Sequence, residues 1–102
     1  MRFVDLRLHD GSRHFISLPE RVSGRELRNH IERLNGARIT DAITESIMEA
    51  WIDFEYAGHS FAVYNHYAEW WFSVNDPNCP DETLGAVANH CAGLLGHATG
   101  GS

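Results

Sequence analysis

The feature that most constrains the fold is an alternation of apolar and other side chains through residues 48–74. Alternation sustained over about four to eight residues indicates a half-buried strand. Two short breaks divide the stretch, one at Ala57-Gly58 and one over 65–68. Glycine tolerates the positive φ that a two-residue hairpin turn requires. Residues 48–74 are therefore predicted to form three consecutive antiparallel strands.

The first break sets the register of the first two strands. A two-residue turn opposes apolar side chains on one face, in the pairs Tyr56–His59, Phe54–Phe61 and Ile52–Val63. Directly opposed residues share a face of the sheet. A shift of one residue would set Phe61 against Glu55 and mix apolar with charged side chains. The apolar register is therefore the predicted one.

The second break is interpreted as a four-residue turn over 65–68, which pairs Tyr64 with Glu69. The same register sets Val63 opposite Trp70 and Phe61 opposite Phe72. One face of the three strands then carries apolar side chains and is predicted to be core: Ile52, Phe54, Phe61, Val63, Trp70, Phe72 and Val74.

The opposite face combines aromatic rings with carboxylates and carries no positive charge. We call it the acid–aromatic face; its residues are Glu49, Trp51, Asp53, Glu55, Ala62, Tyr64, Glu69, Trp71 and Ser73. Trp51 directly opposes Tyr64 in this register, and Trp71 lies across Ala62 from Asp53. Exposed aromatics rimmed by charge are typical of binding surfaces. The predicted binding residues are Trp51, Asp53, Glu55, Tyr64, Glu69 and Trp71. Burial in the core and contact with a second copy of the chain are the alternatives.

A hairpin is predicted at the N-terminal end, because residues 2–8 alternate and Asp10-Gly11 is a strong turn signal. A three-residue loop with Gly11 in a left-handed conformation keeps one apolar face. Its pairs are Leu8–His14, Leu6–Ile16 and Val4–Leu18. A further strand is predicted over 37–43, followed by a turn over 44–46.

Two helices are predicted from their caps and apolar stripes. Ser23 and Glu26 form a capping box that begins a helix over 23–35, and Asn35-Gly36 ends it. Its apolar stripe is Leu27, His30, Ile31 and Leu34. A second helix runs from Pro80 to about Leu95, where Gly96 can end it. Its stripe is Leu84, Val87, Ala88, Cys91, Leu94 and Leu95.

The element order ββα-ββββ-α predicts an α+β fold. We expect one antiparallel sheet of about six strands with both helices packed on one face. A chain of 102 residues corresponds to one domain, assigned to residues 1–96, with a flexible tail over 97–102.

Charge is divided unevenly along the chain, whose formal net charge is -6. All eight basic residues are arginines within the first 38 positions, whereas residues 39–102 carry nine carboxylates and no Lys or Arg. The two halves can complement each other within the sheet, or the acidic half can meet a basic partner. Net acidity argues against nucleic-acid binding. No apolar run is long enough for a membrane span, and the charged N-terminus is unlike a signal peptide, so a cytoplasmic protein is expected.

No catalytic, metal or cofactor site is predicted. The seven histidines match no zinc spacing, and phosphate-binding and dinucleotide motifs are absent. Asp53 with Glu55 or Glu69 can be interpreted as a carboxylate pair for acid–base catalysis, but alternate carboxylates on a strand usually indicate a solvated face. Cys79 and Cys91 fit reduced thiols, and the helix dipole is expected to lower the pKa of the Cys79 thiol.

The sequence thus predicts a small non-enzymatic interaction module that binds an unidentified protein partner through the acid–aromatic face. The charge of that face is compatible with a basic partner. The alternative is a small-molecule-binding protein or minor enzyme with a pocket around Trp71, Tyr64, Asp53 and Glu69. A homodimer formed through this face or through an edge strand is the third hypothesis.

Overall fold

The computed structural model describes residues 3–44 and 49–96, which form one six-stranded antiparallel sheet and two helices. The strands are β1 (Leu6–Arg7), β2 (Arg13–Pro19), β3 (Arg38–Ile43), β4 (Trp51–Tyr56), β5 (His59–His66) and β6 (Glu69–Val74). Helix α1 (Gly24–Glu32) follows β2, and α2 (Asp81–Leu95) follows β6. The predicted α+β class and the order ββα-ββββ-α are confirmed. The predicted tail over 97–102 and most of the turn over 44–46 lie outside the described residues.

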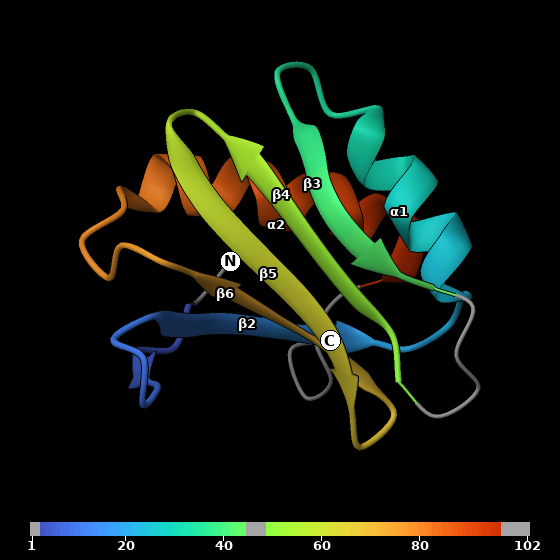
Figure 1. Cartoon of the computed structure of the whole chain (residues 1–102), viewed down its shortest axis with the longest axis horizontal. Coiled ribbons are helices and arrows are strands. Elements are labelled where there is room, and N and C mark those ends of the chain that lie inside the picture. The colour runs from blue at the N-terminus through green and yellow to red at the C-terminus, as the bar shows by residue number, and fades with distance from the viewer. Residues whose placement is uncertain (1–2, 45–48, 97–102) are drawn as a thin grey trace.

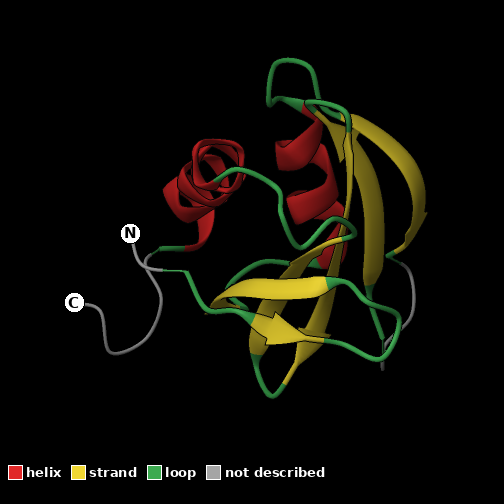
Figure 2. Cartoon of the chain, turned by 90° about the vertical axis from the view of Figure 1, so that its left-hand side faces the viewer, coloured by secondary structure: helices red, strands yellow, loops and turns green. Residues whose placement is uncertain are grey.

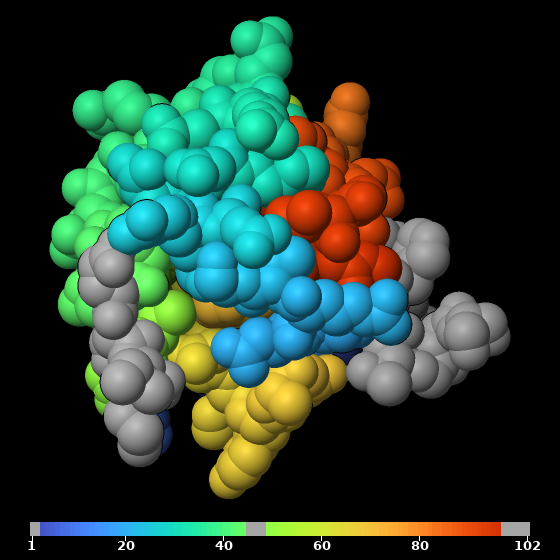
Figure 3. All heavy atoms as spheres, turned by 90° about the vertical axis from the view of Figure 1, so that its right-hand side faces the viewer, coloured from blue at the N-terminus to red at the C-terminus, as the bar shows by residue number. Residues whose placement is uncertain are grey.

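The strands lie in the order β1-β2-β6-β5-β4-β3, so the N-terminal hairpin joins the sheet beside β6. Both helices cover the same face, behind the sheet in Figure 1 and to one side of it in Figure 2. Helix α1 packs on β3 and β4, α2 packs on β2, and the two helices contact each other, as the surface view in Figure 3 also shows. In the described part of the chain, the other face of the sheet carries no helix. Among the described residues no helix is long and apolar enough to span a membrane.

The core lies between the sheet and the two helices. The predicted core face is confirmed, because each of its seven side chains is at most 2% exposed. The helices contribute Leu27, Ile31, Leu84, Val87 and Leu95, which are fully buried. Burial of these side chains is the main favourable term that holds the helices on the sheet.

The predicted register of the β4–β5 hairpin is confirmed. Phe54 pairs with Phe61 and Ile52 with Val63, and the rings of Phe54 and Phe61 stack with centroids 5.2 Å apart. Ala57 and Gly58 have φ values of 52° and 80°, as a two-residue turn with two left-handed residues requires.

The predicted register of the β5–β6 hairpin is wrong by two residues. Its turn is the two-residue Tyr67-Ala68, with φ values of 49° and 62°, and both strands run on to it. The pairs are His66–Glu69, Tyr64–Trp71 and Val63–Phe72. Neither Tyr nor Ala signals a left-handed turn, but the shorter turn adds ladder pairs at its end of the hairpin. A shift of two preserves both faces, so the assignment of residues to faces survives the error.

The pairing predicted for the N-terminal hairpin is also wrong. The loop type is as expected: the amide of Leu8 donates to the carbonyl of Ser12 (2.9 Å), and Gly11 has φ +89°. However, Leu6 pairs with His14 rather than with Ile16. The ladder between β2 and β6 shifts register between His14 and Ile16, and Phe15 and Ile16 are both buried. Strand β2 contributes buried side chains to the core and β1 contributes none, and Leu6 of β1 is 48% exposed.

Both helices begin and end close to the predicted positions. The Ser23 hydroxyl accepts a hydrogen bond from the Glu26 amide (3.2 Å), which confirms the N-cap. The last turn of α1 tightens, with the Leu34 amide donating to the Ile31 carbonyl (3.0 Å), so the α-helix ends at Glu32 rather than at residue 35. Pro80 is the N-cap of α2, and Gly96, with φ +87°, follows its last residue.

Candidate functional site

Three aromatic side chains form a row across the acid–aromatic face, which is the helix-free face of the sheet. Trp51 on β4 pairs with Tyr64 on β5, and Tyr64 pairs with Trp71 on β6. The rings of Trp51 and Tyr64 stack with centroids 5.5 Å apart and an interplanar angle of 18°. Tyr64 and Trp71 are 6.2 Å apart and tilted by 42°. The expected position of Trp71 across Ala62 from Asp53 is therefore wrong, because the β5–β6 shift moves it beside Tyr64.

The three rings differ in how far they are available to a ligand. Trp51 is 44% exposed, whereas Tyr64 and Trp71 are partly buried. Trp71 stacks on the buried ring of His14, with centroids 4.4 Å apart, and its Nε1 is buried without a hydrogen-bond partner among the described residues. Trp51 is thus the most exposed ring of the row, and Trp71 mainly packs β6 against β2.

Asp53 lies in the next row of the sheet, where it pairs with Ala62, and Ala62 pairs with Ser73. The Trp51 indole Nε1 donates to Asp53 Oδ1 at 2.5 Å, which fixes the ring and the carboxylate relative to each other. On the other side, Asp41 of β3 pairs with Asp53. The β3 ladder shifts register between Ile39 and Asp41, which places Asp41 on the acid–aromatic face.

A further carboxylate, that of Asp10, reaches this face from the loop between β1 and β2. The amide and hydroxyl of Ser12 donate to Asp10 Oδ1 at 3.0 Å and 2.6 Å. These bonds lower the pKa of the Asp10 carboxyl, because they stabilise its charged form. Burial and the negative charge of Asp10 raise the pKa of the Tyr64 hydroxyl. Asp10 therefore lies within electrostatic reach of the aromatic row.

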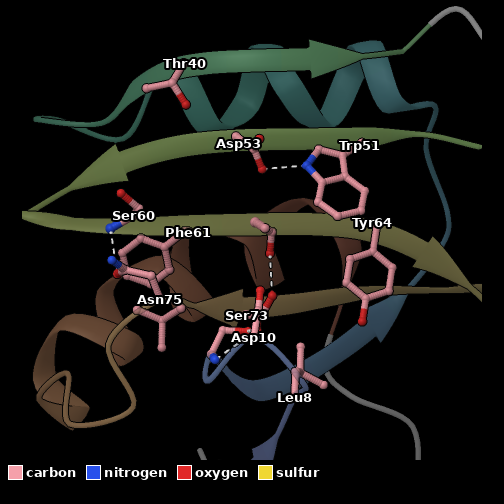
Figure 4. A pocket seen from close by; sticks show the side chains of 13 residues that line it. Leu8, Asp10, Thr40, Trp51, Asp53, Ser60, Phe61, Tyr64, Ser73 and Asn75 are labelled. Atoms are coloured by element: carbon pink, nitrogen blue, oxygen red, sulfur yellow. Dashed lines mark hydrogen bonds between the residues drawn. The ribbon is translucent and has the colours of Figure 1, made fainter.

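The loop and the strands enclose a pocket of about 580 Å³ on the helix-free face (Figure 4). One side is formed by Leu8, Asp10 and Ser12. The other side is formed by Thr40, Trp51 and Asp53, with Tyr64 at one end. Between them lie Ser60, Phe61, Ala62, Ser73, Val74 and Asn75. Among these described residues there is no Lys, Arg or His, so the pocket holds two carboxylates and no cation.

The six predicted binding residues are divided by the structure. Trp51, Asp53 and Tyr64 line the pocket, and Trp71 adjoins it through Tyr64. Glu55 lies at the far end of β4, where it forms an ion pair with Arg38 of β3. Glu69 pairs with His66 and Pro19 at the opposite end of the sheet. Neither glutamate lines the pocket.

Sequence reasoning missed the wall of the pocket that the N-terminal hairpin supplies, and with it Asp10. The Asp10-Gly11 signal identified a turn but not its position over the sheet. That position follows from the pairing of β2 with β6, whose partners are 50 to 61 positions apart, from Pro19–Glu69 to Arg13–Val74. Thr40 was missed because the register shift in β3 has no clear sequence signal.

The cysteines are buried and form no disulfide, and neither lines the pocket. Burial raises the pKa of the Cys79 thiol, so the expected lowering by the helix dipole is wrong. Burial also raises the pKa of Cys91 to about 12. Both thiols are therefore protonated at neutral pH. No group of three or more His, Cys, Asp or Glu side chains within residues 3–44 and 49–96 is arranged to hold a metal ion.

No protein-family model, curated protein or solved structure matches the chain. Its chemistry is therefore interpreted from the pocket and from the acid–aromatic face around it.

Proposed function

We propose that the chain is a non-enzymatic binding module that holds a basic segment of a partner protein on its acid–aromatic face. One observation carries the proposal: Asp10 and Asp53, from segments far apart in the sequence, line one pocket beside the exposed ring of Trp51. Exposed Trp and Tyr contribute disproportionately to binding energy at protein interfaces. Two carboxylates without a neighbouring cation in the pocket lining supply the charge that attracts a basic partner.

The hydrogen bonds within the pocket favour binding over catalysis. A general acid at neutral pH needs a carboxyl whose pKa is raised toward 7. The pKa of Asp10 is shifted in the opposite direction by the Ser12 donors. Asp53 accepts a hydrogen bond from the Trp51 indole Nε1, which holds its carboxylate in one orientation beside the ring. Charged carboxylates held in a fixed orientation suit the recognition of a cation.

The surroundings of the pocket extend its charge. Asp41 lies beside Asp53 on the neighbouring strand, and its Oδ1 accepts from the Ala42 amide at 2.9 Å. Ile43 and Trp51 are paired and are 56% and 44% exposed. A basic segment with an apolar side chain next to its charge is complementary to this arrangement.

A small-molecule ligand is the second candidate, and the size of the pocket favours it. A volume of about 580 Å³ lies within the range typical of ligand sites, about 300–1,000 Å³. Its residues differ from the set expected from the sequence: Tyr64 and Asp53 remain, whereas Trp71 and Glu69 do not line the pocket. A thermal-shift screen with a metabolite library tests this candidate, since a ligand at a hundred times its Kd adds about 2.7 kcal/mol of stability.

Selection of peptides from a random displayed library on the immobilised chain tests the first proposal. We expect the selected peptides to be rich in basic residues and to lose about tenfold or more in affinity for Trp51→Ala, because that ring is the accessible aromatic anchor. Tyr67→Ala is the matched control, because it removes an aromatic ring that is 86% exposed but lies at the β5–β6 turn, outside the pocket. Both variants should unfold cooperatively.

Equal binding of the selected peptides to the wild-type chain and to Trp51→Ala would contradict the proposal. So would a selection that yields no binding peptide. Light scattering tests a third outcome. If the wild-type chain self-associates and Trp51→Ala abolishes this, the partner is a second copy of this chain rather than another protein.

A further inference from the structure

We propose that the pocket is a recognition site for one arginine side chain of the partner, with the guanidinium held by both Asp10 and Asp53 and stacked on the Trp51–Tyr64 pair. The inference rests on the proposed function, since it names the group that the acid–aromatic face binds. Three kinds of lining residue contribute differently. The two carboxylates supply charge, the two rings supply a flat surface, and small side chains leave space for the cation.

The carboxylates are oriented without being saturated. Asp53 uses Oδ1 to accept from the Trp51 indole, and Asp10 uses Oδ1 to accept from Ser12. Within the described part of the chain, no side-chain donor occupies the second oxygen of either carboxylate. A guanidinium carries five N–H donors in a planar fork, so it can bond to carboxylates on two sides at once. An ammonium presents its three donors from a single point and matches two opposed acceptors less well.

The aromatic pair offers a flat surface next to these acceptors. The rings of Trp51 and Tyr64 are within 18° of parallel, and the indole is held in place by its bond to Asp53. Guanidinium groups stack on aromatic faces, where the ring quadrupole attracts the cation. Lysine shares the charge but not the planar shape. The combination of stacking and two acceptors therefore favours arginine.

Small side chains create the space that the cation needs. Ala62 lies between Asp53 and Ser73 in one row of paired residues, so two small residues follow the first carboxylate across the sheet. Figure 4 shows Asp10 approaching this row from the side opposite to Asp53. An arginine entering between the two walls would lie over Ala62. A larger residue at this position would fill the hollow without changing any charge.

The experiment is a titration of the isotope-labelled chain, followed by NMR, with arginine, citrulline and lysine, each blocked at both termini. Citrulline is the neutral isostere of arginine. We expect blocked arginine to shift the Trp51 indole N–H resonance, and to bind about tenfold more tightly than blocked citrulline, since hydrogen bonds to charged groups are the stronger ones. Blocked lysine should also bind more weakly. Free arginine, which carries its own carboxylate, should bind more weakly than the blocked form; tighter binding would indicate a metabolite site instead.

Asp10→Asn and Asp53→Asn test the two carboxylates separately. Asparagine keeps the Oδ1 acceptor that each position uses internally, so the loop and the indole should stay in place while the charge is lost. Each variant should weaken the binding of blocked arginine about tenfold. Glu82→Gln is the control, because it removes the same charge from an exposed position in the first turn of α2, on the helical side of the sheet. Ala62→Leu should abolish binding with the charges intact.

Equal binding of arginine and citrulline, or of arginine and lysine, would overturn the assignment. So would unchanged affinity in both Asp variants. Peptides that the chain selects without any arginine, and that still require Trp51, would overturn this inference while leaving the proposed function standing. If no peptide requires Trp51, the proposed function fails as well.

Discussion

At the scale of single residues, the tips of two hairpins hold backbone conformations that their side chains do not favour. Ala57, Tyr67 and Ala68 have φ values of 52°, 49° and 62°. The left-handed region costs an ordinary L residue roughly 1–2 kcal/mol, and asparagine and glycine much less. At Ala57 the register that opposes apolar side chains on the core face outweighs this cost. At Tyr67 and Ala68 the cost is offset by the ladder pairs that the shorter turn adds at its end of the hairpin.

The strain at Ala57 predicts a stabilising substitution. Ala57→Asn creates the Asn-Gly pair that two-residue turns of this kind prefer, and should raise the free energy of unfolding by roughly 0.5–1 kcal/mol. The measurement is urea unfolding followed by tryptophan fluorescence. Gly58→Ala is the converse control: it places a side chain at φ +80° and should destabilise the chain. An unchanged or lower midpoint for Ala57→Asn would show that the turn is not strained.

His14 is the residue whose burial has a consequence for pH. The residue is only 4% exposed, and its Nε2 lies 3.0 Å from the Ser17 hydroxyl. Burial lowers the pKa of the imidazole below its ordinary value of 6.5, while the Phe72 backbone and the Glu69 carboxylate act in the opposite sense. The folded chain therefore resists protonation of this ring more than the unfolded chain does.

The sign of the pH dependence follows from this lowered pKa. Above pH 6.5 the imidazole is neutral in both states, but below it the unfolded chain binds the proton first, so the stability attributed to His14 falls with falling pH. Unfolding free energies compared at about pH 7.5 and about pH 5.5 should therefore differ less for His14→Phe than for the wild-type chain. His9→Gln, at an exposed position in the neighbouring loop, should keep the wild-type difference. If the unfolding free energy fell by the same amount between the two pH values in His14→Phe and in the wild-type chain, His14 would not be the group that causes the pH dependence.

At the scale of secondary-structure elements, two histidines join the helices reciprocally. The Nε2 of His30 on α1 lies 2.7 Å from the His90 carbonyl, and the Nε2 of His90 on α2 lies 2.6 Å from the His30 carbonyl. The rings stack with centroids 4.1 Å apart and an interplanar angle of 19°. Because a carbonyl only accepts, each Nε2 must carry its hydrogen. The apolar stripe predicted for α1 included His30, but its partner on α2 was not foreseen.

A double-mutant cycle measures this junction. His30→Phe and His90→Phe each keep an aromatic ring for stacking but remove one donor, and each should cost about 1 kcal/mol or more of stability. The coupling energy between them should fall within roughly 0.5–3 kcal/mol, as expected for residues in contact. The control cycle combines His30→Phe with His59→Phe on β5, and should be additive to within about 0.5 kcal/mol. Additivity in the first cycle would show that the two hydrogen bonds act independently.

The success of sequence-based prediction also differs between elements. The β4–β5 hairpin was predictable because Gly58 marks its turn and alternating side chains fix its register. The β5–β6 turn was not, because Tyr67 and Ala68 give no turn signal and the flanking alternation is satisfied equally by registers two residues apart. The bulged strands β2 and β3 were harder still, since an extra residue interrupts the alternation on which the prediction depends.

At the scale of the whole molecule, the candidate site was predictable only on the strands of the local meander. Trp51, Asp53 and Tyr64 follow from alternation and from one turn. Asp10 and the opposite wall depend on where the N-terminal hairpin joins the sheet, and that is decided by pairing with a strand at least 50 positions away. The strand order β1-β2-β6-β5-β4-β3 follows from packing of the complete chain.

The same strand order bears on the sequence of events during folding. Strands β4, β5 and β6 are joined by two-residue turns and pair over short distances along the chain, whereas β2 cannot pair until β6 is present. Pairing β2 with β6 closes a much longer segment of chain than either two-residue turn does, and closing it costs more chain entropy. We therefore expect the β2–β6 ladder to form after the meander. The pocket has one wall on each side of that ladder. A chain that has folded its meander but not docked its N-terminal hairpin would present Trp51 and Asp53 without Asp10, so the complete pocket would form last.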